Sequence, residues 1–109
     1  MNYKQILEHK LNSIFNNEHL RVKVSKALEA YGTQKEEVEP YLVRLAILKN
    51  SGRDYQVIQD TIVVAKENFQ LVLEQAQFPR QTAHINCRDI SQMEAYMEAD
   101  RHEWEKFLA

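Results

Sequence analysis

The sequence predicts an all-α protein: a single-domain bundle of four to five helices over residues 1–109, with a long central helix at about residues 54–77. Three observations support this fold class. A chain of 109 residues is long enough for one domain, and 44% of its residues are hydrophobic, which suffices for a core. Only two Gly and two Pro are present, where average composition would give about thirteen. Because sandwiches and barrels need a turn about every ten residues, this composition favours a few long helices.

The first two expected helices follow from apolar spacing and from residues that favour helix ends. Asn2 can cap a first helix, in which apolar residues recur at spacings of three and four up to Phe15. The pair Asn16-Asn17 then favours a break, because Asn tolerates the backbone conformation in which helices end. A second helix is expected from about Glu18 to Tyr31.

The third helix is expected to begin near a proline. Gly32 is a natural end for the preceding helix, and Thr33 and Glu36 have the spacing of a capping box. A helix that began at Thr33 would be interrupted by Pro40, which lacks a backbone N–H. We therefore expect a short turn near residues 34–38 and a helix with Pro40 in its first turn, ending at residues 50–52.

The longest expected helix begins after Asp54, which can cap it, and ends before Pro79. Two sets of apolar residues recur along it, and together they cover about half of its circumference. Such a helix is either central in the bundle or serves both a core and a partner. The main set is Ile58, Ile62, Ala65, Phe69, Val72 and Ala76, and the second set, spaced by sevens, is Val57, Val64 and Leu71.

The last expected helix combines an apolar face with a surplus of acid. Residues 79–89 have no clean periodicity and predict a loop, after which Asp89 or Ser91 can cap the helix. Residues 89–109 hold six acidic residues against Arg101 and Lys106. An aromatic and Met-rich face with this charge suits docking on a protein partner. That face carries Met93, Tyr96, Met97, Trp104, Phe107 and Leu108.

The residues that could carry catalytic or metal chemistry do not form a recognisable site. His84 and Cys87 are spaced as H-x-x-C, and the last helix could add Glu94, Glu98 or His102. A zinc site needs three or four converging ligands, however, and the chain has one Cys and no C-x-x-C pair. No local signature marks the lone Cys as a nucleophile. The two Gly cannot make a glycine-rich phosphate loop. We expect no metal, no cofactor and no enzymatic activity.

An alternative interpretation is a nucleic-acid-binding regulator of the helix-turn-helix type. The second helix, Gly32 and the following turn resemble that motif, and Val38 falls where it often has an apolar residue. The recognition stretch would be residues 33–40, which hold three Glu against one Lys. Carboxylates there would be repelled by phosphates, so the sequence disfavours nucleic acid as the partner.

The favoured function is a small non-enzymatic protein-interaction module, such as an adaptor or an antitoxin-like or immunity-like inhibitor. We expect it to associate with itself as a homodimer, with another protein, or with both. No apolar run approaches the roughly 18 residues needed to span a bilayer, and MNYKQILEHK lacks the features of a secretory signal. We therefore expect a cytoplasmic protein without a membrane partner. The expected interface residues are Val57, Val64, Leu71, Met93, Met97 and Trp104.

Overall fold

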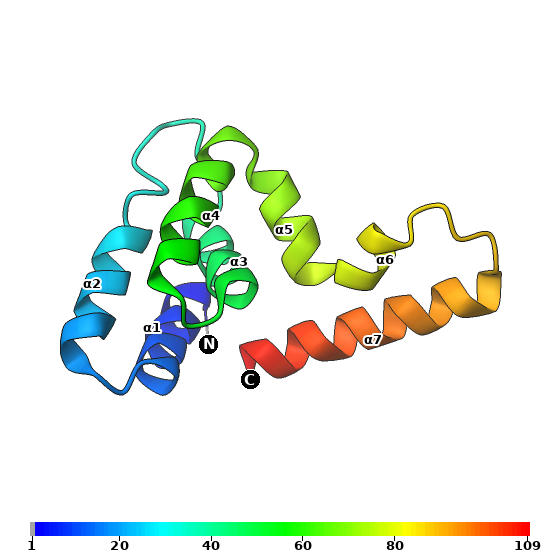
Figure 1. Cartoon of the computed structure of the whole chain (residues 1–109), viewed down its shortest axis with the longest axis horizontal. Coiled ribbons are helices and arrows are strands. Elements are labelled where there is room, and N and C mark those ends of the chain that lie inside the picture. Colours follow the sequence, from blue (N-terminus) through cyan, green and yellow to red (C-terminus); the bar gives the residue numbers. More distant parts are fainter. Residues whose placement is uncertain (1) are drawn as a thin grey trace.

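The computed structural model describes residues 2–109 and confirms the all-α class (Figure 1). Every regular element in these residues is an α-helix, and no strand is present among them. No helix within residues 2–109 is long and apolar enough to cross a membrane. The helices are α1 (Tyr3–Ile14), α2 (Glu18–Leu28), α3 (Pro40–Ser51), α4 (Tyr55–Glu67), α5 (Phe69–Gln77), α6 (Pro79–Ala83) and α7 (Ile90–Leu108).

The central helix of the fold is α3, which contacts α1, α4 and α5. It begins with Pro40 and ends at Ser51, as the sequence predicts. Its residues Leu45–Leu48 are all buried, although four consecutive residues of a helix point to every side. A helix that is buried all round must be surrounded by other elements. The expectation that residues 54–77 form the central helix is therefore wrong.

The predicted long helix is also not continuous, because it breaks at Asn68 into α4 and α5. The backbone N–H of Asn68 donates to the carbonyl of Val64 at the end of α4. Its side-chain oxygen accepts from the N–H of Leu71, 3.3 Å away, and so caps α5. Asn68 is a good capping residue and is the sequence signal for this break. The apolar spacing continues through Asn68, however, and predicts one continuous helix.

Packing on α3 explains the break. With 12 residues α3 is about 18 Å long, whereas a straight helix over residues 55–77 would be about 35 Å long. Half of its apolar face would then extend beyond α3. Broken at Asn68, both halves contact α3. The main apolar set is buried as predicted except for Phe69, which is half-buried; its buried members are Ile58, Ile62, Ala65, Val72 and Ala76.

The first two helices cover α3 and α4, and Asn2 caps α1 as the sequence predicts. The carbonyl oxygen of the Asn2 side chain accepts from the N–H of Gln5, and that of Asn17 accepts from Leu20. The α-helix of α2 ends at Leu28, three residues earlier than expected, and tighter turns follow it. The residues that α1 and α2 bury are Leu7, Leu11, Val24 and Leu28.

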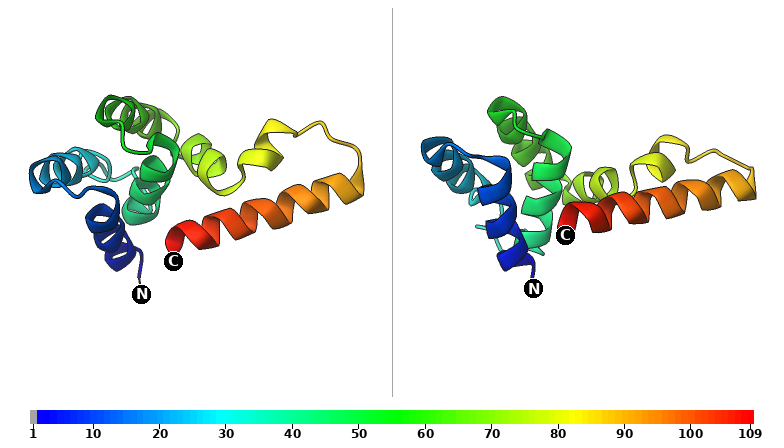
Figure 2. Two further views of the ribbon diagram at one scale, coloured as in Figure 1. Left: turned by 60° about the horizontal axis from the view of Figure 1, so that its bottom comes forward. Right: turned by 90° about the horizontal axis from the view of Figure 1, so that it is seen from below.

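The chain after Gln77 forms a hairpin that projects from the rest of the molecule. Residues 79–83, predicted as loop, form the short helix α6, and α7 begins after its cap Asp89 as predicted. In Figures 1 and 2 the first half of α7 and the loop before it extend away from α1–α4, and the C-terminus returns beside α3. Trp104, Phe107 and Leu108 near that end pack against the core.

The segment between α2 and α3 is a loop closed by one carboxylate. Oε1 of Glu37 accepts from the backbone N–H groups of Gly32, Thr33 and Gln34 at 2.9 to 3.1 Å. Its Oε2 lies 2.8 Å from Nζ of Lys66 on α4. The predicted capping box between Thr33 and Glu36 does not form, because Glu37 takes that place. Residues 33–39 contain no helix; they contain the predicted turn, in which the N–H of Glu37 donates to the carbonyl of Gln34. The recognition helix that the alternative interpretation requires is therefore absent from this stretch.

These contacts fix the ionisation of Glu37. The hydrogen bond from Lys66 lowers the pKa of Glu37 most, partial burial opposes it, and the loop N–H groups lower it further, to about 2. A carboxyl whose pKa is lower in the folded chain stabilises the fold above its unfolded pKa. That contribution disappears as the pH falls from about 4.5 towards about 2.

We predict that Glu37→Gln lowers the thermal unfolding midpoint by several degrees at pH 7. The gap between variant and parent should close as the pH approaches 2, because the parent then loses the same charge. Circular dichroism melts across this pH range measure it. Glu36→Gln is the matched control, since Glu36 is an exposed neighbour with the same charge. Equal effects of the two substitutions, or a gap independent of pH, would contradict the prediction.

Candidate interaction surfaces

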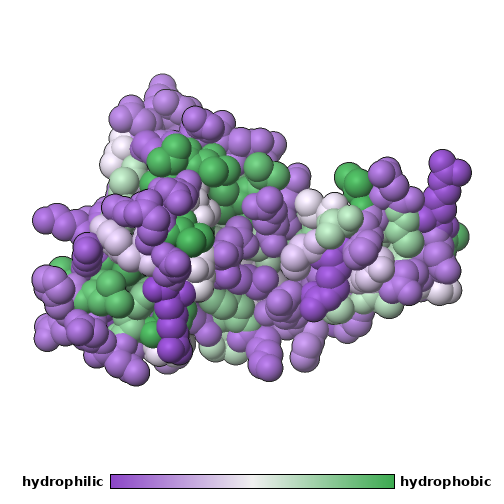
Figure 3. Space-filling model, viewed as in Figure 1, coloured by the Kyte–Doolittle hydropathy of each residue, from purple (hydrophilic) through white to green (hydrophobic). Residues whose placement is uncertain are grey.

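The first candidate surface, called the α4–α5 surface, consists of Val57, Val63, Val64 and Leu71. Their exposed fractions are 39%, 58%, 39% and 37%. Figure 3 shows apolar atoms gathered over α4 and its junction with α5. The opposite face of α4 is in the core, through Ile58 and Ile62, so α4 is apolar on both sides and covered on only one.

The second candidate surface, called the α6–α7 groove, lies between the hairpin helices. Its volume is about 520 Å³. Phe78 and Met97 on its walls are 46% and 51% exposed, and Trp104 beside them is half-buried. A groove whose apolar side chains are this exposed is a typical docking site for a partner. The complete lining is Gln77, Phe78, Gln81, Glu94, Met97, Glu98, Arg101 and Trp104.

A buried carboxylate holds the two walls of the groove together. Asp100 of α7 has no exposed surface. Its carboxylate accepts from the backbone N–H groups of Arg80 and Gln81, at 3.1 and 3.0 Å. These N–H groups belong to the first turn of α6 and have no acceptor within their own helix. The carboxylate also accepts from the side chains of Arg80 and Gln81, at 3.0 and 3.1 Å. Asp100 therefore caps α6 from another helix and satisfies its own charge.

The hydrogen bonds decide the ionisation of Asp100. Burial alone would raise its pKa, but the four donors from Gln81 and Arg80 outweigh burial and lower the pKa below its usual value. Glu103, one turn further along α7, lies 2.9 Å from the Arg80 guanidinium and 3.7 Å from Nζ of Lys49 on α3. These pairs connect the hairpin to the central helix.

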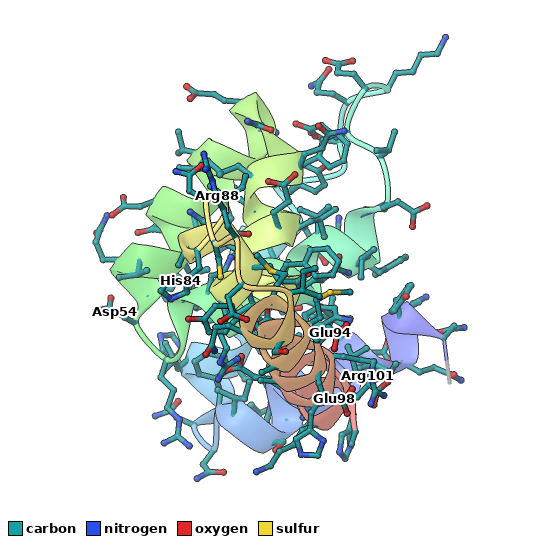
Figure 4. All side chains as sticks on the ribbon, turned by 90° about the vertical axis from the view of Figure 1, so that its right-hand side faces the viewer. Asp54, His84, Arg88, Glu94, Glu98 and Arg101 are labelled. Atoms are coloured by element: carbon teal, nitrogen blue, oxygen red, sulfur yellow. The ribbon has the colours of Figure 1, made fainter. Side chains whose placement is uncertain are left out.

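The rim of the groove is acidic. Arg101 is the one basic residue among the described residues of its lining, and it already pairs with Glu98 and Glu105 on its own helix. No ion pair forms to Glu94 within residues 2–109. In Figure 4, which looks along α7, Glu94, Glu98 and Arg101 lie on one side of the helix and His84 lies on the other.

The structure places the six predicted interface residues on the α4–α5 surface, in the α6–α7 groove and in a hollow beside that groove. Val57 and Val64 lie on α4 and Leu71 on α5, beyond the break. Met97 and Trp104 lie together in the α6–α7 groove. Met93 lies in an adjoining hollow of about 330 Å³ with Cys87, Arg88, Asp89, Ile90, Glu94 and Met97.

Two residues of these surfaces were missed from the sequence. Phe78 lies just outside the long helix predicted for residues 54–77, yet it follows Leu71 by seven residues and so continues the spacing of Val57 and Val64. Val63 was missed because it belongs to neither apolar set. Its 58% exposure shows that α4 is apolar around more of its circumference than the spacing indicates.

The candidate metal and thiol residues make other contacts. The ring of His84 stacks on Tyr96 with centroids 4.6 Å apart. Sγ of Cys87 donates to the backbone oxygen of Asp89 at 3.7 Å. Within residues 2–109 no three His, Cys, Asp or Glu side chains are grouped so that they could hold a metal ion. The contacts of His84 and Cys87 instead stabilise the loop before α7.

Comparison with known proteins assigns nothing to these surfaces. No protein-family model matches the chain, and no curated protein or solved structure matches it. What the α4–α5 surface and the α6–α7 groove do must therefore follow from their geometry and their charge.

We predict that Asp100→Ala lowers the free energy of unfolding by about 2–3 kcal/mol, because it leaves two backbone N–H groups in the first turn of α6 without their acceptor and removes one of the two carboxylates that pair with the Arg80 guanidinium. The partial exposure of Arg80 limits the loss, since water can solvate it. Urea unfolding followed by circular dichroism measures it. Glu94→Ala on the same helix is the matched control and should change stability by less than about 0.5 kcal/mol. Similar losses in both variants would rule out this role for Asp100.

Proposed function

We propose that this protein is a non-enzymatic protein-interaction module that associates with itself through the α4–α5 surface. An adaptor and an antitoxin-like or immunity-like inhibitor both act in this way, by binding alone. The observation that carries the proposal is the exposure of Val57, Val63 and Val64 on α4 and of Leu71 on α5, two helices that each bury another side in the core. Several exposed aliphatic side chains on two consecutive helices of a small protein favour an interface.

A second copy is the partner that this surface fits most simply. Two-fold association packs the same patch against itself and is the commonest oligomer symmetry. If two α4 helices pack antiparallel about the middle of the helix, Val57 of each copy lies opposite Val64 of the other. The same arrangement brings the two Asp60 carboxylates near the two-fold axis, where they repel each other. Association of this kind is moderate rather than obligate.

We predict that the parent chain is a dimer at micromolar concentration and that Val64→Glu is a folded monomer. The substitution places a carboxylate opposite an apolar side chain in the contact, while the 39% exposure of Val64 lets the isolated chain accept it. Sedimentation equilibrium measures the mass, and circular dichroism confirms the fold. Val57→Glu should give the same result.

The matched control is Val22→Glu, because Val22 is 58% exposed on α2, outside the α4–α5 surface. This variant should remain a dimer. Asp60→Asn should strengthen the dimer, because it removes the repulsion at the axis. A monomeric parent, or a Val64→Glu variant that stays dimeric, would refute the proposed self-association.

A further inference from the structure

We propose that the α6–α7 groove docks one amphipathic helix of a partner protein, and that this helix carries Lys or Arg beside its apolar face. The proposal extends the interaction role to a second surface. It does not depend on self-association through α4, since the two surfaces share no residue.

The shape and lining of the groove fit one helix face. An amphipathic helix inserts apolar side chains at positions i, i+3 or i+4, and i+7 into an apolar groove. Here the apolar side chains that line the groove are those of Phe78, Met97 and Trp104. Trp104 stacks on Phe107, with centroids 5.8 Å apart, and both pack against the core, so this end of the groove is firm. Met97 can adapt its conformation to the side chain that it receives.

The fixed walls make the groove a preformed site. Asp100 holds α6 against α7 through four hydrogen bonds, and Glu103 ties α7 to Lys49 of α3. A ligand therefore meets walls that are already in place, which reduces the entropy lost on binding.

The charge of the rim selects a basic partner. Arg101 is shared between Glu98 and Glu105, and Glu94 has no ion pair within residues 2–109, so the rim keeps a negative surplus. The facing wall contributes the neutral side chains of Gln77 and Gln81. Arg80 is directed to Asp100 and Glu103 instead. A helix with cations beside its apolar face complements this rim.

The same charge argues against other occupants. A second copy docked groove to groove would bring two acidic rims together. Anionic lipid and nucleic acid would meet the carboxylates of Glu94 and Glu98 and be repelled. A basic protein helix is the occupant that satisfies both the apolar floor and the rim.

The groove contains its own reporter, because Trp104 is the chain's single tryptophan. The probe is a synthetic helical peptide without Trp, with Leu at positions i, i+3 and i+7 and Lys on both sides of that face. A matched peptide replaces every Lys with Glu. We expect the Lys peptide to give a saturable blue shift of Trp104 emission that weakens as salt is raised. The Glu peptide should give none.

Variants of the protein locate the binding. Met97→Ser should weaken binding of the Lys peptide about tenfold, because it removes an apolar contact from the middle of the groove. Glu94→Lys should weaken it about fivefold through charge repulsion. Glu36→Lys makes the same charge change outside the groove and should leave affinity within about twofold. Phe78→Ser repeats the Met97 test if that variant misfolds, which circular dichroism reveals.

The proposal is overturned if the Lys peptide gives no saturable shift, or if both peptides bind equally. Binding that is unchanged in Met97→Ser and Glu94→Lys also overturns it, as does a larger shift with phosphatidylserine vesicles than with the peptide. The folded Val64→Glu variant should bind the peptide as the parent does. A failure of self-association and a failure of peptide docking can therefore be told apart.

Discussion

The fold depends on the burial of α3, a helix with no side that it can leave in water. Leu45–Leu48 occupy consecutive positions around its axis and all are buried. A helix of twelve residues that is buried in this way needs neighbours in every direction, and a chain of 109 residues has few other helices to supply them. The break at Asn68 supplies two of these neighbours from one stretch of sequence. The position of the α4–α5 surface follows from this, because its four side chains lie on the parts of α4 and α5 that neither α3 nor another helix buries.

Besides the local caps, side chains from outside a helix satisfy backbone groups at the ends of α2 and α6 and in the loop after α2. The Arg44 guanidinium on α3 donates to the carbonyls of Leu28 and Tyr31 at the end of α2. The carboxylates of Glu37 and Asp100 accept hydrogen bonds from backbone N–H groups in the loop after α2 and at the start of α6. Within residues 2–109 no buried side-chain polar atom lacks a partner. These contacts explain how a chain with two glycines can make six connections between helices.

Gly32 is needed for one of these contacts. Its φ of +101° lies in the left-handed region, and a Cβ there would come within 2.8 Å of Cβ of Pro40 and 3.0 Å of the Arg44 guanidinium. The sequence identifies Gly32 as a helix end from local spacing alone. The reason for the glycine is tertiary, since α3 approaches the end of α2 at this point.

Local signals predicted the parts of the fold that are decided locally. Asn2, Asp54 and Asp89 cap helices because each is a good capping residue that precedes an apolar period, and the sequence shows both features. Other features depend on residues that are distant along the chain. The break at Asn68 depends on packing against α3, the Glu37 carboxylate pairs with Lys66, and Asp100 caps α6 from α7. A periodic apolar face cannot show whether its helix bends, since the face of α4 and α5 keeps its spacing through the break.

The same distinction applies to the candidate sites. The sequence identified Met97 and Trp104 as an exposed apolar face of an acidic helix, and the structure adds the opposite wall. That wall exists because Asp100 folds α6 onto α7, which no local pattern signals. Phe78 belongs to the groove for the same reason, since it stands at the turn between α5 and α6.

The two surfaces differ in the charge that borders them, and this difference separates their partners. The α4–α5 surface lies among residues of both signs, including Asp60, Lys66 and Glu67, so a second copy meets no uniform charge there, although the two Asp60 carboxylates repel each other in the proposed dimer. The α6–α7 groove has an acidic rim that disfavours a second copy and favours a basic helix. Because α5 begins beside one surface and ends at the other, the two sites share a rigid helix of about 14 Å without sharing residues. In the proposed dimer each chain therefore leaves its groove open to a partner helix while its own copy covers the α4–α5 surface, an arrangement that would suit an adaptor.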